Sequence, residues 1–390
     1  MRLISFEMRK LFCSKITIIT VMLVLIINIG SALSNAHTWH KYIGDVDIYN
    51  KMVQPYEGKL DKELASKIKT PPGSSDGYDT SSSLSYEQRR KESFEEDYYY
   101  ATEDAEIWNF NKYENPDNPH AVTGLSNLCS TLESRGEKHS YLYSDTLKNL
   151  NMLKATKEPG YYNTTGWANV FTDIAGLPAV IYISIVLIMV IGPIFSNEKR
   201  NNMEKIILST KRGLRKIVSA KIIASLVFTI AWVTLFYVVM CFVNLIPYGA
   251  LTRGNIPLNS LYGYLFTPYN FTVMQALGII YLITILSACT LTIIFCLISS
   301  LSKKNFTSIV CALVFVVVPM YIKDDGEIAK ALILFPSIIM SGNVPFKSYI
   351  SFDIRNTPVM YPNLAVIVLL ITSLVAILLT FKAYSRKIKI

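Results

Sequence analysis

Residues 195–221 hold the side chains whose types and spacing best suit a binding role. This stretch lies between two long apolar runs and carries eight Lys/Arg against two acids. Its apolar side chains recur at the spacing of a helix, around a break at 211–213. They are Met203, Ile206, Ile207, Leu214, Ile217 and Val218. The pattern predicts a short amphipathic helix on a membrane surface, a turn, and a ramp into the next apolar helix.

Six residues of this stretch are candidate contacts for a partner protein: Glu198, Lys199, Met203, Glu204, Ile206 and Ile207. The carboxylates can pair with a basic surface, and the apolar side chains can fill a groove. Two other interpretations stay open. The stretch can be a merely solvated basic loop, and Ile206 with Ile207 can serve as a membrane-surface anchor.

The order of residues in this stretch resembles a loop of the type-2 permeases of ATP-binding-cassette (ABC) transporters. The similarity lies in Phe195, an acid followed by a basic pair, the run 203–210, and an Ile-Val-x-x-Lys sequence that ends at Lys221. Asn202 stands where the family commonly has Gly, and Lys211 where it commonly has Pro. The resemblance covers this loop, the approach to the first apolar run and a six-span layout.

In that family the short helix is the coupling helix, which docks on a separate ATPase subunit. The resemblance therefore implies an ABC ATPase as a partner, ATP with Mg²⁺ bound in that partner, and a second permease chain, identical or related. The chain itself has no G-x-x-x-x-G-K-[ST] loop, since its one Gly-Lys pair, Gly58-Lys59, is followed by Leu60. We expect no cofactor in this chain.

Other residue types that could do chemistry form no recognisable site. His37 and His40 can share a helix face as metal ligands, but the sequence identifies no third ligand. The acidic run at 95–97 is typical of a solvated face. No G-x-S-x-G or H-E-x-x-H motif occurs. The sequence therefore predicts neither an enzyme nor a metal site.

The composition indicates a chain that is partly embedded in a membrane. Of its 390 residues, 51% are hydrophobic, and the mean hydropathy is positive. The net charge of +9 divides into +15 on the segments predicted to be cytoplasmic, −7 on residues 34–173 and +1 on the other outer loops. Because basic residues favour the cytoplasmic side, this charge indicates orientation and contact with the inner leaflet. We expect no nucleic-acid partner.

Six apolar runs predict membrane spans, since a hydrocarbon core requires about 17 to 25 helical residues. The runs are 16–33, 174–195, 222–246, 273–300, 306–322 and 363–381. None contains Asp, Glu, Lys, Arg or His, which argues against coupling to protons or sodium. An even number of spans puts both termini in the cytoplasm. We therefore expect an all-α, multi-pass protein of a bacterial cell membrane.

The domain order follows from these runs. Residues 1–15 form a cytoplasmic interfacial helix with Leu3, Ile4, Met8, Leu11 and Phe12 on one side and Arg2, Glu7, Arg9 and Lys10 on the other. Then come transmembrane helix 1 (16–33), an extracellular domain (34–173), helix 2 (174–195), the cytoplasmic coupling loop (196–221) and helices 3 to 6 (222–390). Residues 331–340 are either a re-entrant or interfacial segment or a packed outer loop. A signal peptide cleaved at 34–36 is the alternative to a retained first helix.

The expected extracellular domain is mostly helical. Helices are predicted over 60–68, over 92–106 behind a capping box at Ser85 and Gln88, and around 147–153. Aromatic residues before the second span are expected to mark the membrane surface: Tyr161, Tyr162 and Trp167. Mildly polar residues within spans are expected to hydrogen-bond between helices: Asn28, Thr229, Thr234, Asn244, Thr290 and Thr292.

These features predict the permease subunit of an ABC exporter, working as a dimer or with a related permease. An uncharged passage suits a lipid-like or amphipathic peptide cargo. The outer domain would gate the path, capture cargo or form a passive cap. One alternative is a membrane-anchored receptor or immunity protein whose outer domain binds a peptide. Another is an integral membrane enzyme, for which a polar cluster at the membrane face would be expected.

Overall fold

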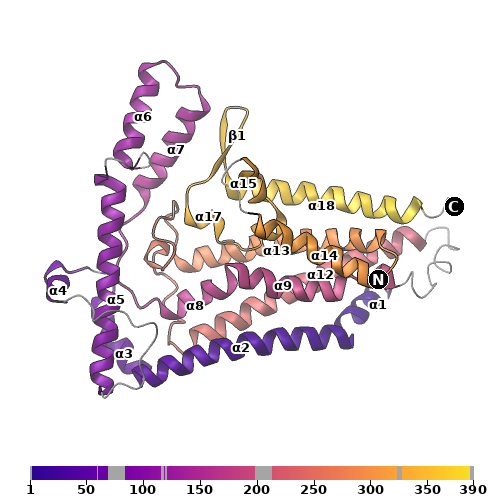
Figure 1. The fold of residues 1–390 in the computed structure, drawn as a ribbon, viewed down its shortest axis with the longest axis horizontal. Coiled ribbons are helices and arrows are strands. Elements are labelled where there is room, and N and C mark those ends of the chain that lie inside the picture. The colour runs from indigo at the N-terminus through magenta and orange to yellow at the C-terminus, as the bar shows by residue number, and fades with distance from the viewer. Residues whose placement is uncertain are drawn as a thin grey trace.

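Long helices lie side by side in a bundle, and a group of shorter helices with the long α5 crosses one end of it (Figure 1). The computed structural model describes residues 2–58, 60–68, 84–115, 118, 121–197, 213–322 and 327–386. About 75% of the described residues are helical. The bundle contains α1 (Arg2–Phe12), α2 (Lys15–Ile43), α9 (Leu177–Ile191), α12 (Gly213–Leu245), α13 (Val273–Leu301), α14 (Asn305–Tyr321) and α18 (Tyr361–Arg386).

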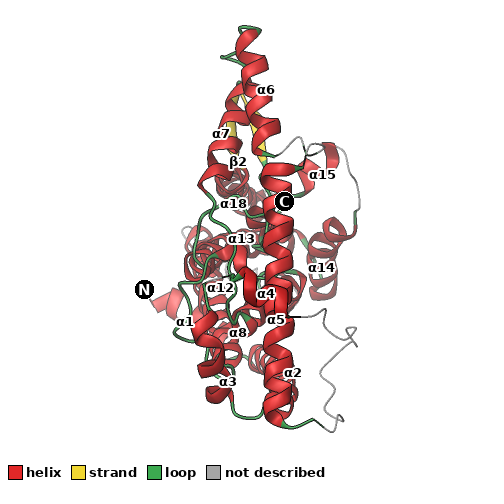
Figure 2. Cartoon of the chain, turned by 90° about the vertical axis from the view of Figure 1, so that its left-hand side faces the viewer, coloured by secondary structure: helices red, strands yellow, loops and turns green. Residues whose placement is uncertain are grey.

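The group at the end of the bundle is built from residues 46–174. It contains α3 (Val46–Val53), η1 (Gln54–Tyr56), α4 (Lys62–Lys67), α5 (Tyr86–Asn109), η2 (Phe110–Glu114), α6 (Val122–Ser134), α7 (Tyr141–Ala155) and α8 (Thr165–Ile174). Helices α6 and α7 form an arm that extends away from the bundle (Figure 2). The prediction of a mostly helical segment is confirmed for the described residues, including the Ser85–Gln88 capping box of α5.

Four described helices are long and apolar enough to cross a membrane: α2, α12, α13 and α18. The bent pair α8 and α9 makes a fifth if it is one span. At 17 residues, α14 is about 25 Å long, just below the roughly 30 Å of a hydrocarbon core. Large apolar side chains on α2 face outward, and Ile16, Ile19 and Ile26 are each more than half exposed. Such outward apolar surface is what lipid would cover.

The first long helix extends ten residues beyond the predicted span 16–33 and ends at Ile43. Nothing in 34–43 breaks a helix, and Trp39 and Ile43 are buried against neighbouring elements. The Trp39 ring lies 4.8 Å from the ring of Tyr248, between centroids. Gly44 then ends the helix with a positive φ of 78°, which glycine adopts readily. Packing therefore continues the helix where hydropathy alone ends it.

The predicted second span is bent instead of straight. Helix α8 ends at Ile174, α9 begins at Leu177, and their axes differ by 45°. Pro178 lies in the first turn of α9, where it lacks an N–H and disfavours helical backbone at the residue before it. The predicted outer boundary at 173 and 174 therefore falls at the end of one helix of a pair.

Two of the three aromatic residues before this bend lie inside the protein, and Tyr162 is partly exposed. Trp167 and Tyr161 are almost completely buried within the protein. Trp167 donates its indole N–H to the carbonyl of Ala250 at 3.1 Å, and the Tyr161 ring packs against the rings of Phe94 and Tyr98. Burial raises the pKa of the Tyr161 hydroxyl, so the ring stays neutral. Trp167 therefore joins the end group to the loop between α12 and α13, whereas Tyr161 packs inside the end group.

Polar residues inside the bundle mostly pair between helices, as predicted. Thr229 of α12 and Thr292 of α13 lie 2.6 Å apart, between hydroxyl oxygens. Asn244 of α12 donates to the Asp173 carboxylate of α8 at 2.7 Å. Thr234 contacts the hydroxyl of Tyr281, and Thr290 contacts that of Ser373. Asn28 is the exception, because it donates to the carbonyl of Val24 in its own helix.

Short elements connect α14 to α18: α15 (Glu327–Leu332), α16 (Pro336–Ile339), α17 (Val344–Lys347), β1 (Ser351–Ile354) and β2 (Thr357–Met360). Helix α16, within the predicted segment 331–340, packs against α13 and α14. Ser287 of α13 donates to the carbonyl of Pro336, and the rings of Phe315 and Phe335 lie 4.8 Å apart. Its depth in a membrane stays a prediction.

Strands β1 and β2 form an antiparallel hairpin that the sequence analysis did not anticipate. The register pairs Ser351 with Met360 and Ile354 with Thr357. The two turn residues, Arg355 and Asn356, both have positive φ. A two-residue turn of this kind matches the twist of the strands it joins. Such turns usually contain Asn-Gly, Asp-Gly or Gly-Gly, and Arg355-Asn356 does not fit this pattern.

Candidate functional site

The predicted partner contacts, Glu198, Lys199, Met203, Glu204, Ile206 and Ile207, lie outside the described residues. The described chain stops at Asn197 and resumes at Gly213. Helix α1 and the far end of α18 lie at the same end of the bundle as the start of α12 (Figure 1). The described residues nearest to the predicted contacts are the two flanks of residues 198–212.

The first flank is fixed to α13 and α14 by hydrogen bonds. The backbone N–H groups of Phe195 and Ser196 donate to the Ser299 hydroxyl at 3.0 and 3.2 Å. The Ser196 hydroxyl donates to the side-chain carbonyl of Asn305 at 2.8 Å. The Asn305 side-chain NH₂ in turn donates to the side-chain carbonyl of Asn197 at 3.2 Å. Ser196 and Ser299 are both fully buried. The chain is thus held up to the last residue before 198.

The second flank is fixed to α1 by a buried ion pair. The Lys221 ammonium nitrogen of α12 lies 3.2 Å from a carboxylate oxygen of Glu7, and the two side chains are 0% and 6% exposed. The ammonium group also donates to the carbonyl of Ile194 at 3.3 Å and lies 5.6 Å from the centre of the Phe195 ring. One side chain therefore joins α1, α12 and the opposite flank.

These contacts define a group that we call the loop base: Glu7, Phe195, Ser196, Lys221, Ser299 and Asn305. The Phe195 ring also packs against the Tyr384 ring of α18 at 5.4 Å between centroids. Residues from α1, α12, α13, α14 and α18 thus meet at the two ends of residues 198–212. Hydrogen bonds and close packing therefore hold the five helices together at this group.

The sequence analysis placed Glu7 on the polar face of the first helix, and this was wrong. Glu7 and Leu11 are buried, one turn apart, whereas Phe6 is 64% exposed. Glu7 is the only acid in an otherwise basic helix. Lys221 was counted with the solvated basic residues of the loop, yet it is fully buried. A single acid on a helix followed far along the chain by a lysine at the start of an apolar run is too weak a signal to predict the pair.

A second polar group, which we call the outer junction, joins the end group to the loop between α12 and α13. It consists of Asn50, Glu57, Asn163 and Arg253. The Arg253 guanidinium lies 3.2 Å from a Glu57 carboxylate oxygen and donates to the Asn50 side-chain carbonyl at 2.8 Å. Asn163 donates to the same carbonyl at 2.9 Å. The Arg253 and Glu57 side chains are 15% and 19% exposed.

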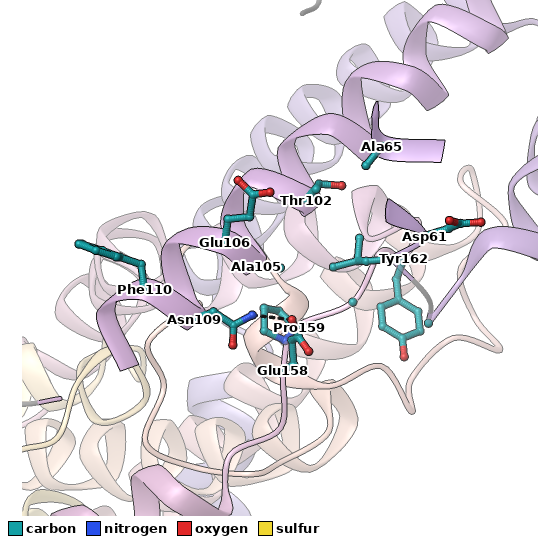
Figure 3. A pocket seen from close by; sticks show the side chains of 13 residues that line it. Asp61, Ala65, Thr102, Ala105, Glu106, Asn109, Phe110, Glu158, Pro159 and Tyr162 are labelled. Carbon is teal, nitrogen blue, oxygen red and sulfur yellow. Dashed lines mark hydrogen bonds between the residues drawn. The ribbon is translucent and has the colours of Figure 1, made fainter. Parts of the chain in front are cut away.

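An open cleft of about 630 Å³ lies between α5 and residues 158–162 (Figure 3). Glu106 and Asn109 of α5 line one wall, and Asn109 donates to the Glu158 carboxylate at 2.6 Å. Asp61, Glu106 and Glu158 are all exposed. Water can therefore solvate these carboxylates, and their presence alone does not indicate a ligand.

The histidines do not form a metal centre with other ligands in the described part of the chain. The His40 ring nitrogen Nε2 lies 2.8 Å from the carbonyl oxygen of Pro247, and His37 is exposed. Within the described ranges, no three His, Cys, Asp or Glu side chains gather as a metal site would require.

Comparison of the chain with known protein families, with curated proteins and with solved structures finds no match.

Proposed function

We propose that the chain is the membrane-spanning subunit of an ABC exporter. In this proposal, residues 198–212 receive an ATPase subunit on Ile206, Ile207 and the neighbouring charged residues. ATP hydrolysis in that partner moves the segment, and the loop base passes the movement to the helices. The spans then open a path for an amphipathic cargo together with a second permease chain.

The loop base is the observation that carries the proposal. A solvated connection needs no fixed ends, whereas a segment that transmits force must not bend at its attachments. Both flanks of residues 198–212 are held by buried polar contacts, including the Glu7–Lys221 ion pair. Maintaining a buried ion pair requires good geometry, because both charges lose their hydration. Such a base is suited to mechanical coupling.

The experiment is purification of the tagged chain from its native membrane in mild detergent, followed by mass spectrometry and an ATP-hydrolysis assay. We expect a stoichiometric ATPase subunit with the unchanged chain. The double variant Ile206→Asp with Ile207→Asp should lose the subunit and its activity, because it puts two charges where apolar contact is proposed.

The matched control is Asn201→Asp with Asn202→Asp. It adds the same two charges to the same segment but removes no apolar side chain. Retention of the ATPase by this control together with its loss in the isoleucine variant would support the proposal. A wild-type chain that purifies without an ATPase would contradict it.

A peptide receptor is the second candidate function. It is favoured by a cavity of about 900 Å³ between the α6–α7 arm of the end group and residues 348–352. A receptor or immunity protein would still bind its peptide in the Ile206→Asp, Ile207→Asp variant, and it would still protect the cell from that peptide. Nothing in this function requires an ATPase. Retained protection in that variant would therefore favour the receptor over the exporter.

A further inference from the structure

We propose that the cavity between the α6–α7 arm and the β1–β2 hairpin binds an amphiphile with an apolar body and one carboxylate group. The cavity has a volume of about 900 Å³, within the range of small-molecule sites. Its apolar walls come from both sides and include Trp108, Leu125, Leu142, Leu153, Phe266 and Phe352. The proposal concerns binding by this chain alone, so it does not depend on an ATPase partner.

The cavity lies between two parts of the molecule that are joined at its rim. The Asp145 carboxylate of α7 accepts hydrogen bonds from Tyr349 at 2.7 Å and from Ser351 at 2.6 Å. Tyr141 also contacts the Ser351 hydroxyl, and Lys148 donates to the carbonyl of Pro358 at 3.3 Å. The arm and the hairpin lie side by side in both views (Figures 1 and 2). These contacts fix the two walls relative to each other.

Lys112 supplies the positive charge for the proposed carboxylate. It lines the cavity from η2, a π-helical turn, and is only 3% exposed. Its ammonium group donates to the Thr156 carbonyl at 2.8 Å and to the Thr156 hydroxyl at 3.3 Å. The nitrogen lies 4.1 Å from the centre of the Trp108 ring and 5.0 Å from that of Tyr113.

Within the described residues, no carboxylate forms an ion pair with Lys112. The carbonyl that it binds belongs to Thr156, the residue that follows the last turn of α7, so the negative end of the helix dipole lies nearby but balances only part of the charge. A buried charge without a full counter-ion is costly and favours an anionic ligand. The other charged residues on the wall are Asp145, which already accepts two hydroxyl hydrogen bonds, and Lys330, which is exposed to solvent. Lys112 is therefore the buried cation of the cavity, and in the described chain it has no carboxylate partner.

Two apolar side chains at the cavity support an apolar ligand body. Leu142 is 47% exposed and Phe266 is 51% exposed, although both lie outside the predicted spans, where lipid would not cover them. They line the cavity from α7 and from the loop between α12 and α13. Covering both would remove apolar surface from water on binding.

The test is isothermal titration of the purified chain in lipid nanodiscs, with empty nanodiscs as the blank. The probes are N-acetyl-trileucine with a free carboxylate, the same peptide as its amide, and decanoate. The free acid should bind about tenfold more tightly than the amide, as expected for a hydrogen bond to a charged group. If decanoate competes with the peptide acid, the natural ligand is assigned to the fatty acids. If decanoate does not compete, the ligand is assigned to peptides with a free C-terminal carboxylate.

Two variants keep the proposal falsifiable. Lys112→Met should abolish the preference for acid over amide while apolar binding remains, and its thermal unfolding midpoint serves as the folding control. Asn149→Trp should narrow the cavity and weaken the binding of both peptides with Lys112 intact. Equal binding of acid and amide by the unchanged chain would overturn the proposal, as would an acid preference that survives Lys112→Met.

Discussion

At the loop base, the ion pair between Glu7 and Lys221 joins α1 to α12, and both side chains are almost completely buried. At the outer junction, the Arg253 and Glu57 side chains remain partly exposed to solvent. Both groups fix a polar segment to the same apolar bundle. The difference lies in what happens when one partner is removed. Water can reach the remaining charge at the outer junction but not at the loop base.

The largest effect is expected from Lys221→Met. This change leaves the Glu7 carboxylate buried without its counter-charge, so the free energy of unfolding should fall by about 3–5 kcal/mol. Denaturant unfolding in detergent measures the change. The double variant Glu7→Leu with Lys221→Met should regain most of the loss, because an apolar pair avoids the desolvation of two charges. If the single variant lost only a few tenths of a kcal/mol, this ion pair would contribute no more than an exposed surface ion pair, and the prediction would be wrong.

A smaller effect is expected from Arg253→Met at the outer junction. The variant loses hydrogen bonds to Asn50 and Glu57, but solvent reaches the remaining carboxylate, so we expect a loss of about 1–2 kcal/mol. High salt should reduce this loss more than that of Lys221→Met, because exposed charges are screened more strongly. Lys91→Met, which removes an exposed pair with Glu95, is the control and should change stability by at most about 0.5 kcal/mol.

The smallest effect is expected inside the bundle, where no charge is involved. Thr292→Val removes the hydroxyl that contacts Thr229 and should cost about 0.6 kcal/mol. Thr20→Val is the matched control, since the Thr20 hydroxyl bonds only to the Ile16 carbonyl of its own exposed helix face. If Thr292→Val were as destabilising as Lys221→Met, the contrast between charged and neutral contacts would not hold.

Hydropathy and local spacing predicted the positions of the helices well. Five of the six predicted apolar runs each lie within a single helix, to within one residue, and the run 174–195 is the exception because of the bend before α9. The Ser85–Gln88 spacing predicted the start of α5. The exact ends of elements depended on tertiary packing, as in the extension of α2 to Ile43. The bend before α9 and the β1–β2 hairpin depended on local backbone geometry at Pro178 and Asn356 that hydropathy does not record.

Long-range pairs were the part that the sequence could not predict. Glu7 and Lys221 are 214 residues apart in the chain, and each has an ordinary solvated interpretation on its own element. The same holds for Lys112, whose surroundings come from α5, η2 and the end of α7. Only the fold brings these groups together, so one sequence identified the candidate segment at 198–212 but not the contacts that hold it.

The continuity of α2 has a mechanical consequence. Its 29 residues form an uninterrupted rod about 44 Å long, with α1 and the ion pair of Glu7 at one end and α3 and α5 beside the other. A lever of that length that tilts by about 10° displaces its tip by about 8 Å. A small rotation of α2 at its first turn would thus become a larger displacement at its other end, beside α3 and α5.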